Sequence, residues 1–205
     1  MAVTFAAEGA IGYITLDKPP ANSYDKDYMD ELGAAVDAAA ADDAVKVVIV
    51  RSASKKFFSA GADIKAFMAN DTAANMAMIE RGHEVLAGIA RVPKIFIAQI
   101  EGHALGGGLE IGLACDLRFG ARGDYKLGVP EVTLGLLPGN GGTQRLSRII
   151  GVPKALDLMI TGRPISPGEA HALGILDRLF PAAETADRTR EYAENLAKGA
   201  TVAIG

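Results

Sequence analysis

The chain has 205 residues and a formal net charge of −4 at pH 7, a length that suits one domain with a sizeable hydrophobic core. The acidic balance gives no electrostatic basis for binding nucleic acid, and the single cysteine, Cys115, excludes an intrachain disulfide. No apolar run approaches the roughly 20 residues that a membrane-spanning helix needs, and the N-terminus lacks the basic region of a signal peptide. We therefore expect a single domain over residues 1–205 in the cytoplasm, with no membrane and no nucleic-acid partner.

Strand-like and helix-like segments alternate along the chain. Runs of β-branched and aromatic residues predict strands, and apolar residues three or four positions apart predict helices. Strands are expected at residues 11–17, 45–50, 94–100, 117–121, 125–128 and 175–180. Helices are expected at residues 27–40, 73–91, 109–115, 143–150, 153–161, the short segment beginning at Ser166, and 182–198. Because a strand, a helix and a second, nearly continuous apolar strand come in that order, the sequence predicts a layered α/β fold with a parallel sheet.

A glycine-rich loop, residues 101–110 with the sequence EGHALGGGLE, joins the predicted strand 94–100 to the predicted helix 109–115. Gly106, Gly107 and Gly108 allow backbone conformations that a Cβ would forbid. The N–H groups at a helix start lack intrahelical partners and face the positive end of the helix dipole, which favours a negative oxygen. The loop matches neither the dinucleotide pattern nor the P-loop pattern. It therefore remains a candidate oxyanion site, or a turn with a purely structural role.

Two glutamates, Glu110 and Glu131, are candidate catalytic acids and bases. Glu110 ends the glycine-rich loop, and Glu131 follows Pro130 at the end of the predicted strand 125–128. We expect the strands 117–121 and 125–128 to form a hairpin-like path that returns Glu131 to the helix start. Two neighbouring carboxylates cannot both ionise easily, so that one can give a proton while the other takes one. From spacing alone, each glutamate could equally be a solvated surface charge.

Five motifs, in this order between about residues 18 and 180, resemble the enoyl-CoA hydratase/isomerase (crotonase) family: FFSAGADIK, EGHALGGGLE, LACD, PEVTLGLLPGNGGTQRL and ITGRPISPGEAHALGILD. The resemblance implies an α/β (α+β) fold, a spiral of ββα units with two near-perpendicular sheets flanked by helices. It also implies an acyl-CoA thioester substrate and no metal or redox cofactor, since coenzyme A is carried by the substrate. His83, His103 and His171 show no paired metal-ligand spacing, which agrees with the absence of a metal.

The resemblance also assigns roles to individual residues. The N–H groups of Ala62 and Gly107 would form an oxyanion hole, and Glu110 and Glu131 match the pair that holds and activates a water. Residues 60–65 would line the adenine and phosphate site of CoA, and Gly139 would lie close to the catalytic water. The expected substrate-binding residues are thus Ala60, Gly61, Ala62, Asp63, Ile64, Lys65, Gly107 and Gly139. One departure is Asn140, which stands where the family more often has Ala.

The function implied by these matches is that of an enoyl-CoA hydratase, which adds water across the 2,3 double bond of a trans-2-enoyl-CoA to give 3-hydroxyacyl-CoA. The presence of both glutamates favours hydration over the alternatives, which are an isomerase, an acyl-CoA hydrolase or a non-catalytic acyl-CoA-binding member. A serine hydrolase is disfavoured because Ser59 lacks the first Gly of the G-x-S-x-G pattern. The resemblance further implies a homotrimer or a dimer of trimers, built by C-terminal helices that we expect to be missing beyond residue 205.

Overall fold

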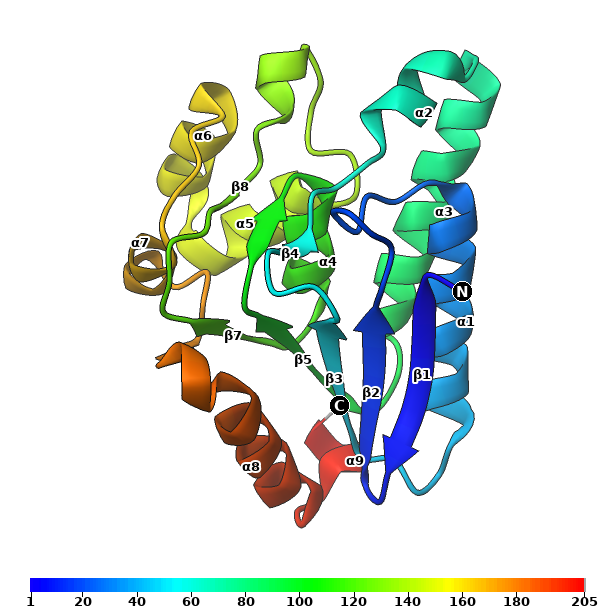
Figure 1. The fold of residues 1–205 in the computed structure, drawn as a ribbon, viewed down its shortest axis with the longest axis vertical. Coiled ribbons are helices and arrows are strands. Elements are labelled where there is room, and N and C mark those ends of the chain that lie inside the picture. Colours follow the sequence, from blue (N-terminus) through cyan, green and yellow to red (C-terminus); the bar gives the residue numbers. More distant parts are fainter. Residues whose placement is uncertain (205) are drawn as a thin grey trace.

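The computed structural model describes residues 1–204, in which two β-sheets are flanked by helices (Figure 1). The larger sheet has the strand order β1-β2-β3-β5-β7-β9, and the smaller sheet has the order β4-β6-β8. The larger sheet contains β1 (Val3–Glu8), β2 (Ile11–Leu16), β3 (Val47–Ser52), β5 (Ile95–Ile100), β7 (Leu117–Ala121) and β9 (Arg178–Phe180). The smaller sheet contains β4 (Phe57–Ser59), β6 (His103–Leu105) and β8 (Leu127–Gly128).

Each strand of the smaller sheet directly follows a strand of the larger one. The chain passes from β3 to β4, from β5 to β6 and from β7 to β8, and a helical segment comes after each pair. Because both sheets keep the same order, the chain advances as a spiral of ββα units, which confirms the predicted fold. The strands from β2 to β9 in the larger sheet pair in parallel, as the apolar run at residues 45–50 predicted.

The predicted hairpin between residues 117–121 and 125–128 is wrong. β7 pairs in parallel with β5 and β9 in the larger sheet, whereas β8 pairs in parallel with β6 in the smaller sheet. The buried Tyr125 lies where the chain crosses between the sheets, with its hydroxyl 2.9 Å from the carbonyl oxygen of Ile100 and 2.8 Å from that of Ala121. The sequence analysis also missed β1, β4 and β6, because β1 is largely exposed and β4 and β6 have three residues each.

The helices largely follow the predicted ones. They are α1 (Lys26–Ala41), α2 (Ile64–Ala69), α3 (Thr72–Ile89), α4 (Gly107–Ala114), α5 (Gly142–Ile150), α6 (Val152–Thr161), α7 (Pro167–Leu173), α8 (Thr185–Ala197) and α9 (Thr201–Ile204). Short 3₁₀ turns are η1 (Glu131–Leu134) and η2 (Ala182–Glu184). Ser166 caps α7 as predicted, since its hydroxyl accepts the N–H of Glu169 at 3.1 Å.

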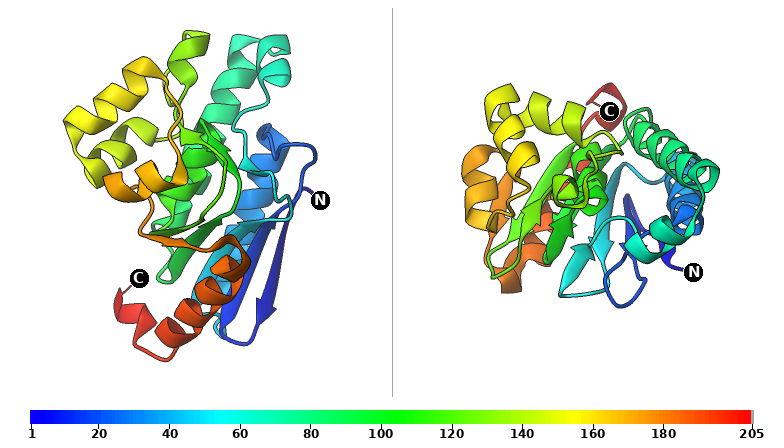
Figure 2. Two further views of the ribbon diagram at one scale, coloured as in Figure 1. Left: turned by 60° about the vertical axis from the view of Figure 1, so that its left-hand side comes forward. Right: turned by 90° about the horizontal axis from the view of Figure 1, so that it is seen from above.

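Alternate residues of the central strands pack against opposite faces of the larger sheet. Val48 and Val50 of β3 join a core shared with α1, α3 and α4, whereas Val47 and Ile49 join a second core with α8. Figure 2 shows α8 on one side of this sheet and α1 with α3 on the other. Helix α4 is buried along its whole length within the first core, so the glycine-rich loop that begins α4 is held rigidly.

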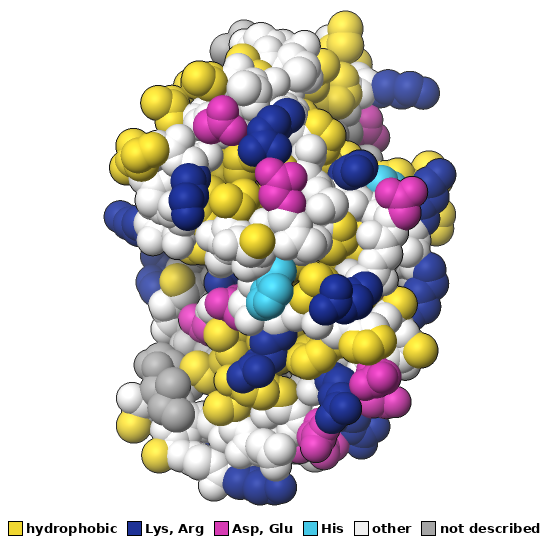
Figure 3. Space-filling view, turned by 90° about the vertical axis from the view of Figure 1, so that its left-hand side faces the viewer, with side chains coloured by type: hydrophobic (Ala, Val, Ile, Leu, Met, Phe, Trp, Pro, Cys, Tyr) yellow, Lys and Arg dark blue, Asp and Glu magenta, His cyan; other side chains and the backbone are white. Residues whose placement is uncertain are grey.

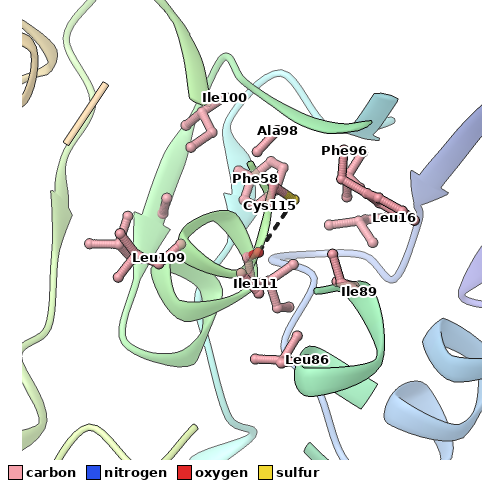
Figure 4. Close-up of a cluster of buried hydrophobic side chains, with 14 of the residues drawn as sticks. Leu16, Phe58, Leu86, Ile89, Phe96, Ala98, Ile100, Leu109, Ile111 and Cys115 are labelled. Carbon is pink, nitrogen blue, oxygen red and sulfur yellow. Dashed lines mark hydrogen bonds between the residues drawn. The ribbon is translucent and has the colours of Figure 1, made fainter. Parts of the chain in front are cut away.

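Cys115 lies in that first core, as expected for a small buried residue. Figure 4 shows its sulfur directed toward the carbonyl oxygen of Ile111, at 3.6 Å, among apolar side chains that include Phe58. Burial raises the pKa of the Cys115 thiol to about 12, so this thiol is inert at neutral pH. Among the described residues, none of the helices has both the length and the apolar character needed to cross a bilayer.

Candidate active site

A cavity of about 180 Å³ lies where the β4–α2 connection, the start of α4 and the loop over residues 130–140 meet. Apolar side chains form much of its wall, among them Phe67, Ile79 and Leu136. The cavity is lined by most of the predicted site residues, namely Ala60, Gly61, Ala62, Ile64, Gly107, Glu110, Glu131 and Gly139. The fold therefore gathers residues that are up to 79 positions apart in the sequence, from Ala60 to Gly139, around one space.

Asp63 and Lys65 are the predicted site residues that do not line the cavity. The Asp63 carboxylate caps α2 by accepting the N–H groups of Lys65 and Ala66 at 3.0 and 3.1 Å. Lys65 is exposed in this short helix. The structure thus gives Asp63 a capping role, and the contact of either residue with CoA stays a prediction.

The N–H group of Ala62 is directed away from Tyr24, the residue with which Ala62 is paired. Tyr24 bridges in parallel to Ala62: the N–H of Tyr24 donates to Gly61 O at 2.9 Å, and the N–H of Asp63 donates to Tyr24 O at 2.8 Å. In a parallel pair these bonds use the groups on either side of the central residue, so its own N–H faces the opposite way. Within residues 1–204, the structure shows no acceptor for the N–H of Ala62.

The N–H group of Gly107 lies close to the segment that contains Ala62. As the first residue of α4, Gly107 has no intrahelical acceptor. Gly61, whose φ is 88°, approaches so closely that a Cβ there would be 2.8 Å from Leu105 O and 3.1 Å from the Gly107 nitrogen. Two unpaired N–H groups on adjacent segments, both lining the cavity, form an arrangement able to bind a negatively charged oxygen.

Ser59, which the sequence analysis considered as a possible nucleophile, is fully buried next to this loop, and its hydroxyl already forms two hydrogen bonds. Its hydroxyl donates to Asn22 O at 2.7 Å and accepts the N–H of Gly61 at 3.2 Å. Asn22 in turn uses its side-chain amide to donate to Ser52 Oγ and Phe58 O at 2.8 and 3.0 Å. These bonds fix the loop before α1 against β4, and they give Ser59 a structural role.

The Glu110 carboxylate is 1% exposed and held by two backbone groups. Its Oε1 accepts the N–H of Asn140 at 2.8 Å and the N–H of Gly142 at 2.7 Å. Burial raises the pKa of Glu110 above its ordinary value, and the two N–H bonds and the positive charge of Arg145 oppose this rise. Glu110 is thus fixed in place, with one carboxylate oxygen committed to the backbone.

The Glu131 carboxylate reaches the same region from η1. A Cβ on Gly106 would lie 3.0 Å from Glu131 Oε1, which places this carboxylate beside the start of α4. Its Oε2 is buried and has no hydrogen-bond partner within residues 1–204. Burial, together with the negative charge of Glu110, raises the pKa of Glu131 to about 7. The two glutamates meet as the sequence analysis expected, although the chain brings them together through two sheets and not through a hairpin.

Tyr24 and Asn140 are cavity residues that the sequence analysis did not assign to the site. Both are buried, at 4% and 3% exposure, and the Asn140 Nδ2 donates to the Tyr24 hydroxyl oxygen at 2.6 Å. Tyr24 lies in a loop between predicted elements and belongs to no motif. The departure at Asn140 from the family's usual Ala was the one sequence signal that pointed to this pair.

No group of three or more His, Cys, Asp or Glu side chains within residues 1–204 is arranged to hold a metal ion.

The fold and the site together define an α/β protein of spiral ββα architecture, in which the backbone donors Ala62 and Gly107 and the two carboxylates line one cavity. A profile described as enoyl-CoA hydratase/isomerase matches residues 6–204. An enoyl-CoA hydratase from Geobacillus kaustophilus HTA426 has a crystal structure that superposes with a TM-score of 0.96 and 49% identity, covering 99% of this chain and 77% of that one. The chain therefore belongs to the enoyl-CoA hydratase/isomerase family and has the crotonase fold.

Relatives of this chain differ in length. The probable enoyl-CoA hydratase of Bacillus subtilis (strain 168) is 42% identical over 178 residues, which are 85% of this chain and 67% of that protein. The fatty acid oxidation complex subunit alpha of Shewanella amazonensis is 40% identical over 190 residues, which are 91% of this chain but 27% of that protein. The chain thus spans between about a quarter and two thirds of these two proteins.

Proposed function

We propose that the chain is an enoyl-CoA hydratase, which adds water across the 2,3 double bond of a trans-2-enoyl-CoA thioester to give 3-hydroxyacyl-CoA. The observation that carries the proposal is the pairing of Glu110 and Glu131 beside the N–H groups of Ala62 and Gly107 in one cavity. Similarity to the probable enoyl-CoA hydratase of Bacillus subtilis supports it. So does 34% identity over 203 residues with the short-chain-enoyl-CoA hydratase of Clostridium acetobutylicum.

The two backbone N–H groups bind the thioester carbonyl oxygen in this proposal. When water attacks the β-carbon, electrons move through the α-carbon onto that oxygen, which becomes an enolate. Preorganised donors stabilise such charge more strongly in the transition state than in the ground state. Because Ala62 and Gly107 are fixed by the bridge to Tyr24 and by the buried helix α4, they need no reorganisation to do so.

The two glutamates handle the water and the protons. One O–H bond of water breaks as its oxygen bonds to the β-carbon, and a proton is added to the α-carbon. Glu131, with a pKa of about 7 and an unpartnered Oε2, exchanges a proton readily at neutral pH. Glu110 is positioned by two backbone N–H groups and serves as the second member of the pair. Gly139 lines the cavity together with Asn140, and in this proposal the attacking water binds beside it.

The substrate is an acyl-CoA thioester whose acyl part meets the apolar wall of the cavity. We propose that Ala60, Gly61, Asp63, Ile64 and Lys65 contact the adenine and phosphates of CoA at the cavity mouth. Hydration forms one C–O and one C–H bond while the C=C π bond and one O–H bond of water break, with no net change of oxidation state. The reaction therefore needs no redox cofactor, and we propose that the two carboxylates act without a metal.

We also propose assembly as a homotrimer or a dimer of trimers in the cytoplasm. Val152, Leu156 and Ile160 recur every four residues along α6 and are 65%, 49% and 62% exposed. Figure 3 shows apolar side chains on the face of the molecule where α6 lies. Exposed apolar surface of this kind marks interaction sites, and light scattering of the full-length protein that returns a monomer would contradict the proposal.

Isomerase, hydrolase and non-catalytic binding are separated from hydratase by one experiment. Crotonyl-CoA and, separately, a 3-enoyl-CoA are incubated with the protein, the absorbance of the 2-enoyl thioester is followed, and the products are identified by mass. A hydratase removes the absorbance and adds the mass of one water without releasing CoA. A hydrolase releases free CoA, an isomerase acts instead on a 3-enoyl-CoA, and a binding protein changes none of these substrates.

A further inference from the structure

We propose that the Tyr24 hydroxyl is a third hydrogen-bond donor to the thioester oxygen, and that Asn140 is the positioning residue that directs it. This inference rests on the proposed acyl-CoA site and goes beyond it, because it adds a side-chain donor to the two backbone donors. It arises from the placement of Tyr24, from the bonding of its hydroxyl and from the contacts of Asn140.

Tyr24 spans the distance between the two backbone donors. Its main chain is bonded on both sides of Ala62, to Gly61 O and from the N–H of Asp63. Its hydroxyl lies against the other donor, since a Cβ on Gly107 would overlap the Tyr24 oxygen and come within 2.6 Å of the ring atoms Cε1 and Cζ. The ring and hydroxyl of Tyr24 therefore pack against Gly107 at the start of α4 and line the same cavity as Ala62 and Gly107.

The bonding of the Tyr24 hydroxyl leaves its proton free. The hydroxyl oxygen accepts a hydrogen bond from Asn140 Nδ2 at 2.6 Å. With Asn140 Nδ2 facing the hydroxyl, the structure shows no acceptor for the hydroxyl proton within residues 1–204, although the Tyr24 side chain is only 4% exposed. The same amide orientation leaves Asn140 Oδ1 buried without a partner. A buried donor without a partner is unfavourable, and a substrate oxygen in the cavity would supply the missing acceptor. Burial and the charges of Glu110 and Glu131 raise the pKa of Tyr24, so the hydroxyl keeps its proton and acts as a neutral donor.

Asn140 connects this hydroxyl to the glutamate pair. Its backbone N–H donates to Glu110 Oε1, and its backbone oxygen accepts from Arg145 Nη1 at 2.9 Å. Its side chain, packed against Gly82, has room for no large movement. Asn140 thus fixes one oxygen of Glu110 and the Tyr24 hydroxyl at the same time, and an Ala at this position would fix only the former.

Tyr28 provides a matched control for Tyr24. It is the next tyrosine along the chain, 1% exposed in the same core, and its hydroxyl has no hydrogen-bond partner within residues 1–204. Tyr28 does not line the cavity. Replacing either tyrosine by Phe removes one buried hydroxyl and leaves the ring. Tyr24→Phe differs from Tyr28→Phe in losing the hydrogen bond from Asn140, which Asn140→Ala also removes, and in losing the proposed contact with the substrate.

The first measurement is the hydration of crotonyl-CoA by Tyr24→Phe, Tyr28→Phe and Asn140→Ala. A single oxyanion donor contributes about 10²–10³ in rate where it has been measured, and for a third donor we expect Tyr24→Phe to lower kcat by about 10- to 100-fold with little change in KM. Asn140→Ala should give a smaller fall of the same kind, and Tyr28→Phe should match wild type. An unchanged kcat in Tyr24→Phe would overturn the inference. This result is expected if the Asn140 amide is reversed, so that its oxygen accepts the Tyr24 proton. Hydration of crotonyl-CoA by wild type would still support the proposed function in that case.

The second measurement does not depend on turnover. Butyryl-CoA with a ¹³C-labelled carbonyl cannot be hydrated, and each donor on its oxygen lowers the infrared stretching frequency of that carbonyl. Tyr24→Phe should shift the bound frequency back toward that of free butyryl-CoA, whereas Tyr28→Phe should leave it at the wild-type value. If wild type fails to hydrate crotonyl-CoA but this shift is seen, the proposed function fails and the inference stands. Equal frequencies in wild type and Tyr24→Phe, or no binding of butyryl-CoA at all, would contradict the inference.

Discussion

The backbone N–H of Gly142 donates a 2.7 Å hydrogen bond to Oε1 of Glu110, a residue that lies 32 positions earlier in the chain. Gly142 is the first residue of α5, where its N–H has no intrahelical partner. The start of one helix thus holds a carboxylate that projects from another. The approach is close, because a Cβ on Gly142 would lie only 2.9 Å from that same oxygen.

Gly142→Ala should therefore displace the Glu110 carboxylate and impair catalysis. A shift of about 1 Å at a reacting group can lower the rate by about 10²-fold, and we expect a fall of that order in kcat with the protein still folded. Gly88→Ala is the control, since a Cβ there meets nothing within 4 Å. Comparable kcat values for the two variants would show that the position of Glu110 does not matter.

Gly107→Ala should destabilise the fold as well as the site. A Cβ at Gly107 would lie 2.6 Å from the Tyr24 ring atoms Cε1 and Cζ and would overlap the Tyr24 hydroxyl oxygen. Overpacking of this kind lowers the free energy of unfolding by about 1–3 kcal/mol. In urea unfolding, Gly107→Ala combined with Tyr24→Ala should lose less stability than the sum of the two single changes. Strict additivity would mean that the two residues do not collide.

Glu131 should make stability depend on pH. Its pKa rises from an ordinary value of 4.5 to about 7 on folding, so between these pH values the folded chain keeps a proton that the unfolded chain has lost. The contribution of Glu131 to the free energy of unfolding therefore falls as the pH rises from about 4.5 to about 7, and it is constant above that pH. The free energy of unfolding of Glu131→Gln, minus that of wild type, should increase from about pH 4.5 to about pH 7 and then level off. A difference that is independent of pH would place Glu131 in water and not in the cavity.

Much of the architecture was predictable because local patterns carry it. The continuous apolar run of β3 follows from its burial between two helical layers, and the cap at Ser166 follows from side-chain chemistry within a few residues. Of the smaller sheet, β8 lies within the strand expected at residues 125–128, whereas β4 and β6 were not predictable in this way. The strands of this sheet are two or three residues long, so their pairing is determined by tertiary contacts and leaves no periodicity in the sequence.

The candidate site shows the same division. Glu110 and the glycine-rich loop were recognisable because helix starts and carboxylates have a chemistry that can be read from neighbouring residues. Tyr24 was not, because its importance comes from contact with Ala62 and Gly107, which are far away in the sequence. The path that brings Glu131 to Glu110 was predicted wrongly, since a turn over residues 122–124 suggests a hairpin unless the separate pairing partners of β7 and β8 are known.

The central claim is that Glu110 and Glu131 act together on one water, and the most direct test is the hydration rate of crotonyl-CoA with Glu110→Gln, Glu131→Gln and the double variant. The amide keeps the size of the side chain but cannot exchange a proton, so each single variant should lose about 10²–10⁴ in kcat. The double variant should lose far less than the product of the single losses, because groups that act as a unit are not additive. A folded single variant that hydrates crotonyl-CoA at close to the wild-type rate would contradict the account.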